Sequence, residues 1–205
     1  MKLVLVTAGL SSPSSTRMLA DRLAEATARR VRAADPEAEP VAVAAVELRE
    51  LARDIAGHLV TGFPPPALDA ALTEVAGADA VIAVSPVFSA SYSGLFKSFF
   101  DVLDPEALTG KPVLIGATGG SPRHSLVLEH ALRPLFSYLR AVVVPTGVYA
   151  ASEDWGAEGL AERVDRAGGE LAALLTGGPA TRAHRPELDF TPFTERLAGL
   201  RDGAG

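Results

Sequence analysis

Three polar segments of the sequence, each directly after an apolar run, carry the side chains that could bind a ligand or do chemistry. The first segment is Gly9-Leu-Ser-Ser-Pro-Ser-Ser-Thr-Arg17, which follows the run Leu3-Val-Leu-Val6 and precedes a stretch with helical apolar spacing. The start of a helix offers unpaired backbone N–H groups, and hydroxyl groups add further donors there. The first segment therefore predicts a phosphate site that needs no lysine, although an ordinary helix cap rich in serine would give the same pattern.

The second and third segments could hold a flat ring. The second, Ser85-Pro-Val-Phe-Ser-Ala-Ser-Tyr-Ser-Gly94, has small residues that let backbone groups approach a heterocycle, and Phe88 could pack beside it. The third, Thr118-Gly-Gly-Ser-Pro-Arg-His124, offers glycine N–H groups and polar tips for the edge of a pyrimidine-like ring. Taken singly, Phe88 could be core, and the two glycines could form a tight turn. The coincidence of three such segments at strand ends favours a shared ligand site.

Strands and helices must bring these segments together. Short apolar runs predict five strands at residues 2–8, 41–46, 80–84, 113–117 and 141–144. Helical spacing predicts helices after Arg17 and at about 48–59, 68–76, 93–103, 124–139 and 160–175. Pro134 predicts a kink or a bulge in the helix over 124–139. Strands alternating with helices indicate a doubly wound parallel sheet, whose right-handed crossovers bring the three segments to one edge.

The composition is that of one globular domain. The 205 residues are 48% hydrophobic and 21% charged, and a net charge of −6 argues against a sequence-independent nucleic-acid binder. The chain has no cysteine, which excludes disulfides and thiolate catalysis, and it has no apolar run of membrane-spanning length, so we expect a cytoplasmic protein. We assign residues 1–176 to the domain and 177–205 to a C-terminal extension with a short helix. Four apolar residues of the extension cover either their own domain or a neighbouring subunit: Phe190, Phe193, Leu197 and Leu200.

Several common catalytic motifs are missing from the sequence. It contains no G-x-x-x-x-G-K-[ST] loop, no G-x-G-x-x-G after the first strand, no G-x-S-x-G elbow and no H-E-x-x-H pair. The predicted strand ends lack the carboxylates of a phosphorylatable receiver domain. The histidines, at positions 58, 124, 130 and 184, are too scattered to indicate a metal site, so we expect none.

One longer pattern resembles a known family. The run from Ser85 to Asp101, followed by Leu108-Thr-Gly-Lys111 and Ala117-Thr-Gly-Gly120, is similar to the NAD(P)H-dependent FMN reductases over about residues 1–150. Within that family, the likeness is to the reductases that supply alkanesulfonate monooxygenases. The resemblance implies an α/β flavodoxin-like fold, with a five-stranded parallel sheet in the order 2-1-3-4-5 and helices on both faces. It also implies FMN and either NADPH or NADH as ligands, and assembly as a homodimer or homotetramer.

The resemblance also assigns the residues of the site. The FMN phosphate would be bound by Ser11, Ser14, Ser15 and Thr16. The isoalloxazine ring would be flanked by Pro86, Val87, Phe88 and Ser89, and its polar edge would be lined by Thr118, Gly119, Gly120 and Ser121. The sequence departs from the family pattern in three places. Arg17 follows the phosphate loop rather than lying inside it, Phe88 replaces a common tyrosine, and His130 stands where sulfonate-linked relatives often have a tyrosine in a subunit-contacting helical turn.

The expected reaction is hydride transfer from the reduced nicotinamide to flavin N5. This chemistry belongs to the ligands, so we expect no side-chain acid or base, and backbone donors near Ser89 or at residues 118–121 would stabilise the charge of the reduced flavin. The reduced FMN would then pass to a partner monooxygenase. The alternatives are a quinone or azo reductase that keeps its FMN as a prosthetic group, a non-enzymatic electron carrier of the flavodoxin type, and a flavin-binding protein without activity.

Overall fold

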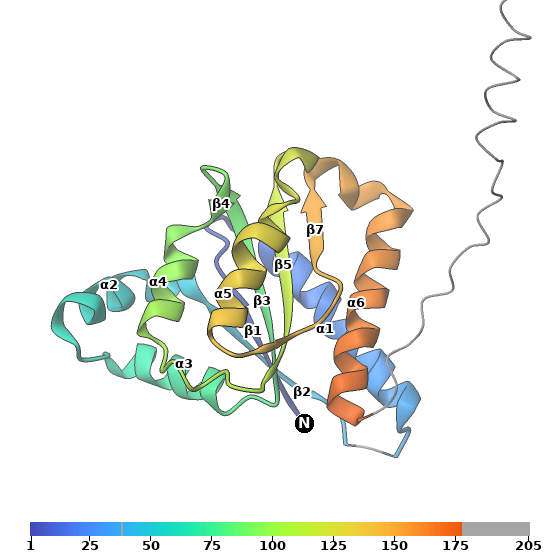
Figure 1. Ribbon diagram of the computed structural model, residues 1–205, viewed down its shortest axis with the longest axis horizontal. Coiled ribbons are helices and arrows are strands. Elements are labelled where there is room, and N and C mark those ends of the chain that lie inside the picture. Colours follow the sequence, from blue (N-terminus) through green and yellow to red (C-terminus); the bar gives the residue numbers. More distant parts are fainter. Residues whose placement is uncertain (38, 178–205) are drawn as a thin grey trace, which may run out of the picture.

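A sheet of seven strands forms the centre of the molecule, and the computed structural model describes residues 1–37 and 39–177 around it. The strands are β1 (Lys2–Thr7), β2 (Ala42–Glu47), β3 (Ala80–Phe88), β4 (Ser91–Tyr92), β5 (Pro112–Gly119), β6 (Val142–Val143) and β7 (Val148–Ala151). The main path is parallel and runs β2-β1-β3-β5-β6, with β7 continuing beside β5 (Figure 1). This confirms the order predicted for the five main strands.

Two layers of helices cover the sheet. The helical segments are α1 (Ser15–Ala34), η1 (Leu48–Leu51), α2 (Ala52–Thr61), α3 (Pro66–Ala76), α4 (Gly94–Val102), η2 (Pro122–His124), η3 (Leu128–Leu132), α5 (Arg133–Tyr138), η4 (Ser152–Gly156) and α6 (Glu158–Thr176). Helices α1 and α6 pack together on one face, whereas α2, α3, α4 and α5 lie over the other (Figure 1). Because crossovers on both faces return the chain to the same edge, the ends of β1, β3 and β5 lie side by side.

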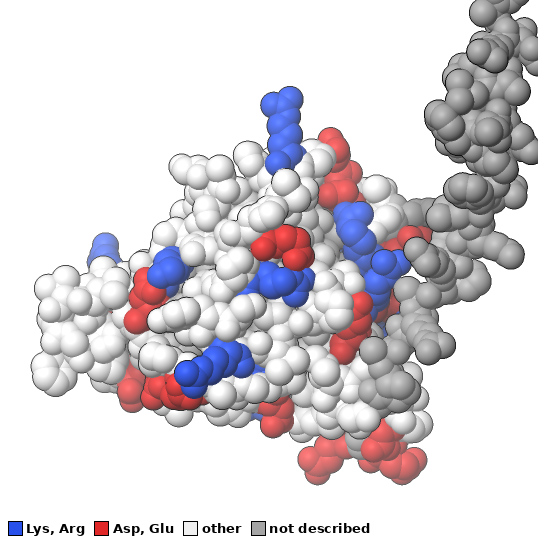
Figure 2. Space-filling model, in the orientation of Figure 1, with Lys and Arg blue, Asp and Glu red and all other residues white. Residues whose placement is uncertain are grey.

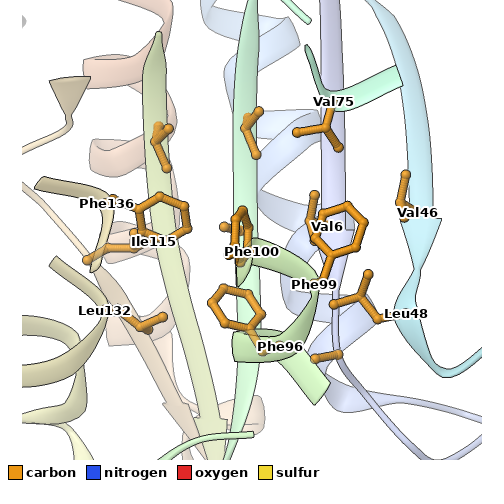
Figure 3. Close-up of a cluster of buried hydrophobic side chains, with 14 of the residues drawn as sticks. Val6, Val46, Leu48, Val75, Phe96, Phe99, Phe100, Ile115, Leu132 and Phe136 are labelled. Carbon is orange, nitrogen blue, oxygen red and sulfur yellow. The ribbon is translucent and has the colours of Figure 1, made fainter. Parts of the chain in front are cut away.

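Alternation along the strands builds a core on each face. In β1, Leu3 and Leu5 belong to the core under α1 and α6, whereas Val4 and Val6 belong to the core on the other face. Both sets are buried, as expected of a parallel sheet covered by helices on both sides. Phe96, Phe99 and Phe100 of α4 point into the second core beside Phe136 of α5 (Figure 3). The α4 phenylalanines are therefore core side chains of their own domain.

The fifth predicted strand, residues 141–144, corresponds to the short β6, and a further strand, β7, follows it. Pro145 has no N–H with which to continue the ladder, and the chain leaves the sheet there. Thr146 is instead held by α6, since its N–H and its Oγ1 each donate to Glu170 at 2.7 Å. The chain then rejoins β5 as β7, which the sequence analysis did not predict.

The helix predicted over 124–139 is irregular. Residues 122–124 form the short turn η2, and Leu128–Leu132 form a π-helical turn, η3, directly before α5. The Arg133 N–H bonds the Leu128 carbonyl, five residues back. A proline within a regular helix would clash with the carbonyl four residues before it, and for Pro134 that residue is His130. The wider π turn accommodates the proline, so the predicted bulge is confirmed, and the predicted helix over 124–139 is divided among η2, η3 and α5.

The described chain ends directly after α6. Gly177 follows Thr176 with φ +66°, a left-handed conformation that suits glycine at a helix end. Apart from Gly177, the predicted C-terminal extension lies outside the described residues. Within the part of the chain that the structure describes, no helix is both long and apolar enough to cross a membrane.

Candidate functional site

The first segment (residues 9–17) leads from β1 into α1. Ser14 is the N-cap of α1, and its Oγ accepts a hydrogen bond from the Arg17 N–H at 3.2 Å. Gly9 packs closely against this cap, because a Cβ there would lie 1.9 Å from Ser14 Oγ. Ser11 and Ser15 are exposed beside the free N–H groups of the helix start. The segment thus combines both interpretations of its serines: one caps the helix, and others face outward at an anion-binding position.

A buried hydrogen bond joins the first segment to the third. Thr16 Oγ1 and Thr118 Oγ1 lie 2.9 Å apart, and either hydroxyl could be the donor. Both side chains are at most 3% exposed. Because a buried hydroxyl without a partner is costly, this pair fixes the start of α1 against the end of β5.

The second segment (residues 85–94) is not the loop that the sequence analysis expected. β3 continues to Phe88 and then folds back as β4, with Val87 opposite Tyr92. The turn uses Ser89 and Ala90 at φ 48° and 69°, so the backbone there is left-handed. Beyond Pro86, β3 no longer pairs with β1 or β5, and its hydrogen-bonding partner there is the antiparallel strand β4. Pro86, Val87 and Phe88 are therefore presented by a strand, and Phe88 stays 45% exposed.

Ser85 anchors this hairpin to the body of the protein. Its buried hydroxyl donates to the Pro86 carbonyl and accepts the Ser93 N–H, both at 2.9 Å. The Ser93 hydroxyl in turn caps α4 by accepting the Phe96 N–H at 3.1 Å. These three bonds set the exit of β3 and the entry of α4 together.

The third segment (residues 118–124) begins on β5. Tyr149 of β7 donates its hydroxyl to the Ser121 carbonyl at 2.7 Å, and a Cβ at Gly119 would lie 2.2 Å from that hydroxyl. Burial raises the pKa of Tyr149, and the nearby charge of Asp154 raises it further, so the phenol stays protonated as a donor. Gly120 is exposed, and a Cβ there would meet open space. Tyr149 thus fixes the backbone at Gly119 and Ser121, while Gly120 between them faces open space.

The ends of the three segments enclose a cleft of about 390 Å³. Its lining consists of Gly9, Leu10, Ser11, Ser15, Thr16, Pro86, Val87, Phe88, Thr118, Gly119, Gly120, Ala150, Ser152 and Trp155. Most residues predicted for the site are in this set. Three are not: Ser14 caps α1, Ser89 lies in the hairpin turn, and Ser121 offers its carbonyl to Tyr149.

One wall of the cleft comes from β7 and η4, which the sequence analysis missed. Trp155, the only tryptophan of the chain, lines the cleft, and the Arg22 guanidinium lies 5.0 Å from the centroid of its ring. Asp154 holds η4 in place, because it accepts the Ala151 N–H at 2.7 Å and pairs with Arg163 at 3.2 Å. In the sequence, only the single tryptophan among polar residues could have indicated this wall.

Arg17 does not line the cleft. Its guanidinium donates to Asp21 and to Glu47, each at 2.8 Å, and the hydrogen bond to Asp21 is the main reason that its pKa is raised. The phosphate loop therefore lies beside an arginine that is already paired.

The donors of the cleft suit a phosphorylated flat ring. Hydroxyls and helix N–H groups lie at one end, and the exposed Phe88, the open Gly120 and Trp155 lie around the rest. Nothing in this donor set resembles a metal site, and within residues 1–37 and 39–177 no three histidine or carboxylate side chains gather as ligands. The residues that are present thus fit FMN.

The sequence matches known flavin reductases over most of its length. A family model described as NADPH-dependent FMN reductase matches residues 1–156. An FMN reductase (NADPH) of Pseudomonas aeruginosa is 38% identical over 182 residues, which cover 86% of this chain and 93% of the relative. The NADH-dependent FMN reductase SfnF of Pseudomonas fluorescens is also 38% identical over 182 residues, covering 86% of this chain and 92% of that protein.

Solved structures show the same fold. An oxidoreductase from Corynebacterium diphtheriae is 48% identical with a TM-score of 0.82, and the match covers 87% of this chain and 98% of that one. An archaeal flavodoxin, only 14% identical, has a TM-score of 0.58 and covers 86% of this chain and 99% of its own. The second likeness concerns the fold alone, and with the strand order it confirms the flavodoxin-like architecture.

Proposed function

Because the chain belongs to the NADPH-dependent FMN reductase family, we propose that it reduces FMN with NADPH or NADH in the cleft at the edge of the sheet. The observation that carries the proposal is the cleft itself. It joins the helix start of α1, the exposed Phe88 and the glycines of the third segment, which are separated in sequence by about a hundred residues. The buried Thr16–Thr118 hydrogen bond holds the first and the third of these parts together.

Three parts of the cleft would contact the flavin. We assign the phosphate to Ser11, Ser15 and Thr16, with Ser14 shaping the loop as the helix cap. Pro86, Val87, Phe88 and Ser89 would flank the ring, and Thr118, Gly119, Gly120 and Ser121 would face its polar edge. Trp155 joins this set as an additional wall.

The chain's own contribution to the reaction is orientation and electrostatics. Bound FMN supplies the hydride acceptor, its N5 atom, and the nicotinamide supplies the hydride. No side-chain acid or base is needed, so backbone N–H groups at residues 89 and 118–121 would stabilise the resulting negative charge. Because Gly120 has no side chain and borders open space, the nicotinamide has room to reach the ring.

The fate of the reduced FMN is the finer part of the proposal. We infer delivery to a partner monooxygenase, with the protein working in the cytoplasm, where its nicotinamide substrates are found. A quinone or azo reductase with permanently bound FMN is the alternative, and a flavodoxin-type electron carrier is the non-enzymatic one.

Assembly of like subunits is also part of the proposal. A groove of about 580 Å³ runs between α4 and the η3–α5 segment, and Tyr92, His130, Pro134 and Tyr138 are among its lining residues. Tyr138 is 83% exposed there. On the face of the molecule seen in Figure 2, charged side chains of both signs lie in small separate groups. The two charged residues that line the groove, Lys97 and Asp101, pair with each other and leave no net charge there. A second copy of the chain fits these features better than a charged partner does.

The direct test measures oxidation of NADH and NADPH by the purified chain, with and without added FMN, at the nicotinamide absorbance. We expect turnover that needs added FMN and saturates with it. Turnover that is supported by flavin already on the protein, and unchanged by added FMN, would favour the prosthetic-group alternative. If flavin binds but neither coenzyme is oxidised, the protein is an electron carrier or a binding protein, and the proposed reductase activity is wrong.

A further inference from the structure

Two arginines lie beside the phosphate loop, and one carboxylate binds both. Glu47 Oε1 accepts a hydrogen bond from Arg17 Nη1 at 2.8 Å, and Glu47 Oε2 lies 3.2 Å from Arg49 Nε. Arg49 also donates through Nη1 to the Ser11 carbonyl at 3.2 Å, so its guanidinium touches the loop that lines the cleft. All three side chains are partly buried, between 23% and 34% exposed.

The sheet fixes this carboxylate beside the loop. Glu47 is the last residue of β2, and it lies opposite Thr7, the last residue of β1, directly before the first segment. Arg49 follows on η1, and Arg17 lies in the first turn of α1. Backbone pairing therefore fixes the position of Glu47. From that position its carboxylate pairs with both arginines, which could otherwise turn toward the loop.

The remaining groups around the arginines are also acidic. Asp21 accepts from Arg17 Nε at 2.8 Å, and Glu50 lies 3.9 Å from Arg49 Nη2. The five side chains of this cluster carry two positive and three negative formal charges. Although two guanidinium groups adjoin the phosphate loop, the cluster offers no net positive charge to a phosphate.

We propose that Glu47 sets how tightly the cleft holds the flavin phosphate, by keeping Arg17 and Arg49 from pairing with it. This inference rests on the proposed function. The phosphate is then held by neutral hydroxyl and backbone donors, which lack the positive charge and the bidentate geometry of an arginine. FMN bound in this way exchanges with solution, as a substrate must, and Glu47 is the positioning residue that makes it do so.

The test is Glu47→Gln, with the dissociation constants of FMN and riboflavin measured side by side from the quenching of Trp155 fluorescence. Glutamine keeps the shape but holds the arginines less firmly. Removing one negative charge beside the phosphate loop should tighten FMN binding by about three- to tenfold. Riboflavin has no phosphate, so its dissociation constant should change by less than about twofold. FMN binding by E47Q should also weaken more steeply with added salt than it does in the wild type.

Glu50→Gln is the matched control. It removes the same charge from the next turn, but Glu50 does not bind Arg17 and is 70% exposed. We expect it to leave FMN affinity nearly unchanged. Equal tightening by E50Q and E47Q would mean that overall charge, rather than the bridge between the arginines, sets the affinity, and would overturn the proposal.

A second variant guards against a folding defect in E47Q. Glu47→Asp keeps the charge but is one methylene shorter, so it cannot hold both arginines as Glu47 does, and it should also tighten FMN relative to riboflavin. The result counts for a variant whose melting temperature equals that of the wild type. If such a variant binds FMN no more tightly than the wild type does, the proposed role of Glu47 is wrong. If the wild-type chain binds neither flavin, the proposed function itself is wrong, and that outcome is distinct from equal FMN binding by wild type and variants.

Discussion

At the scale of single residues, the Thr16–Thr118 hydrogen bond is the contact on which the cleft most depends. Thr16→Val keeps the side-chain shape but leaves the Thr118 hydroxyl buried without its partner. We expect the free energy of unfolding to fall by about 1–3 kcal/mol, because a buried hydroxyl pays its desolvation without a compensating bond. Equilibrium unfolding in urea, followed by circular dichroism, measures this change.

Two further variants separate the hydrogen bond from packing. Thr16→Ser retains the hydroxyl and should lose much less stability than T16V. The double variant T16V/T118V leaves no orphan hydroxyl, so its loss should be smaller than the sum of the two single losses. Strictly additive losses would show that the two hydroxyls do not stabilise each other.

The residue types of the site could be predicted from the sequence, but the role of each residue could not. Hydroxyls after a strand indicated an anion site, yet Ser14 and Ser15 are indistinguishable in the sequence. Only the turn geometry makes Ser14 the cap and leaves Ser15 in the cleft. Glu47 ends β2, and Trp155 lies in η4 after β7, so their places beside the first segment depend on long-range pairing of strands.

At the scale of elements, Tyr149 ties β7 to the third segment through its hydroxyl. Its pKa is raised above the ordinary value of 10.0, mainly by burial, so folding favours the protonated phenol. That stabilisation is complete below pH 10 and is lost as the pH rises through the raised pKa of the folded state. We therefore expect Tyr149→Phe to be less stable than the wild type at pH 8, and the gap between the two proteins to narrow above pH 10.

Urea unfolding of both proteins at several pH values between 8 and 11 measures this gap. Tyr138→Phe is the matched control, because that side chain is 83% exposed and its substitution should change the free energy of unfolding little. A gap that stays constant across the alkaline range would mean that the stabilisation does not depend on the proton of Tyr149.

The elements themselves were predicted best where one local pattern decides them. Fully apolar runs predicted β1, β3 and β5, because a strand buried on both faces of the sheet is apolar at nearly every position and can be recognised from its own residues. The predictions failed where distant contacts decide. β7 forms because β5 offers a free side after the break at Pro145, and the end of β3 stays extended because β4 pairs with it. Pro134 predicted an irregular helix but could not say that the chain would widen into a π turn.

At the scale of the whole molecule, two exposed aromatic residues allow the assembly proposal to be tested. Tyr138 borders the groove between α4 and α5, whereas Phe63 lies between α2 and α3, and they are 83% and 80% exposed. If a second copy covers the groove, Tyr138→Asp places a charge in an apolar contact, where it is costly. We expect Y138D to shift the mass measured by light scattering toward that of a monomer across a dilution series.

Phe63→Asp makes the same change in charge and size on a surface outside the groove, so it should leave the mass unchanged. The contrast matters more than either variant, because both remove an exposed aromatic ring, and neither residue belongs to the buried core. Dissociation by F63D but not by Y138D would move the interface to the α2–α3 corner. A wild-type chain that is monomeric at every concentration would remove the assembly proposal altogether, because the groove would then have no second copy to cover it.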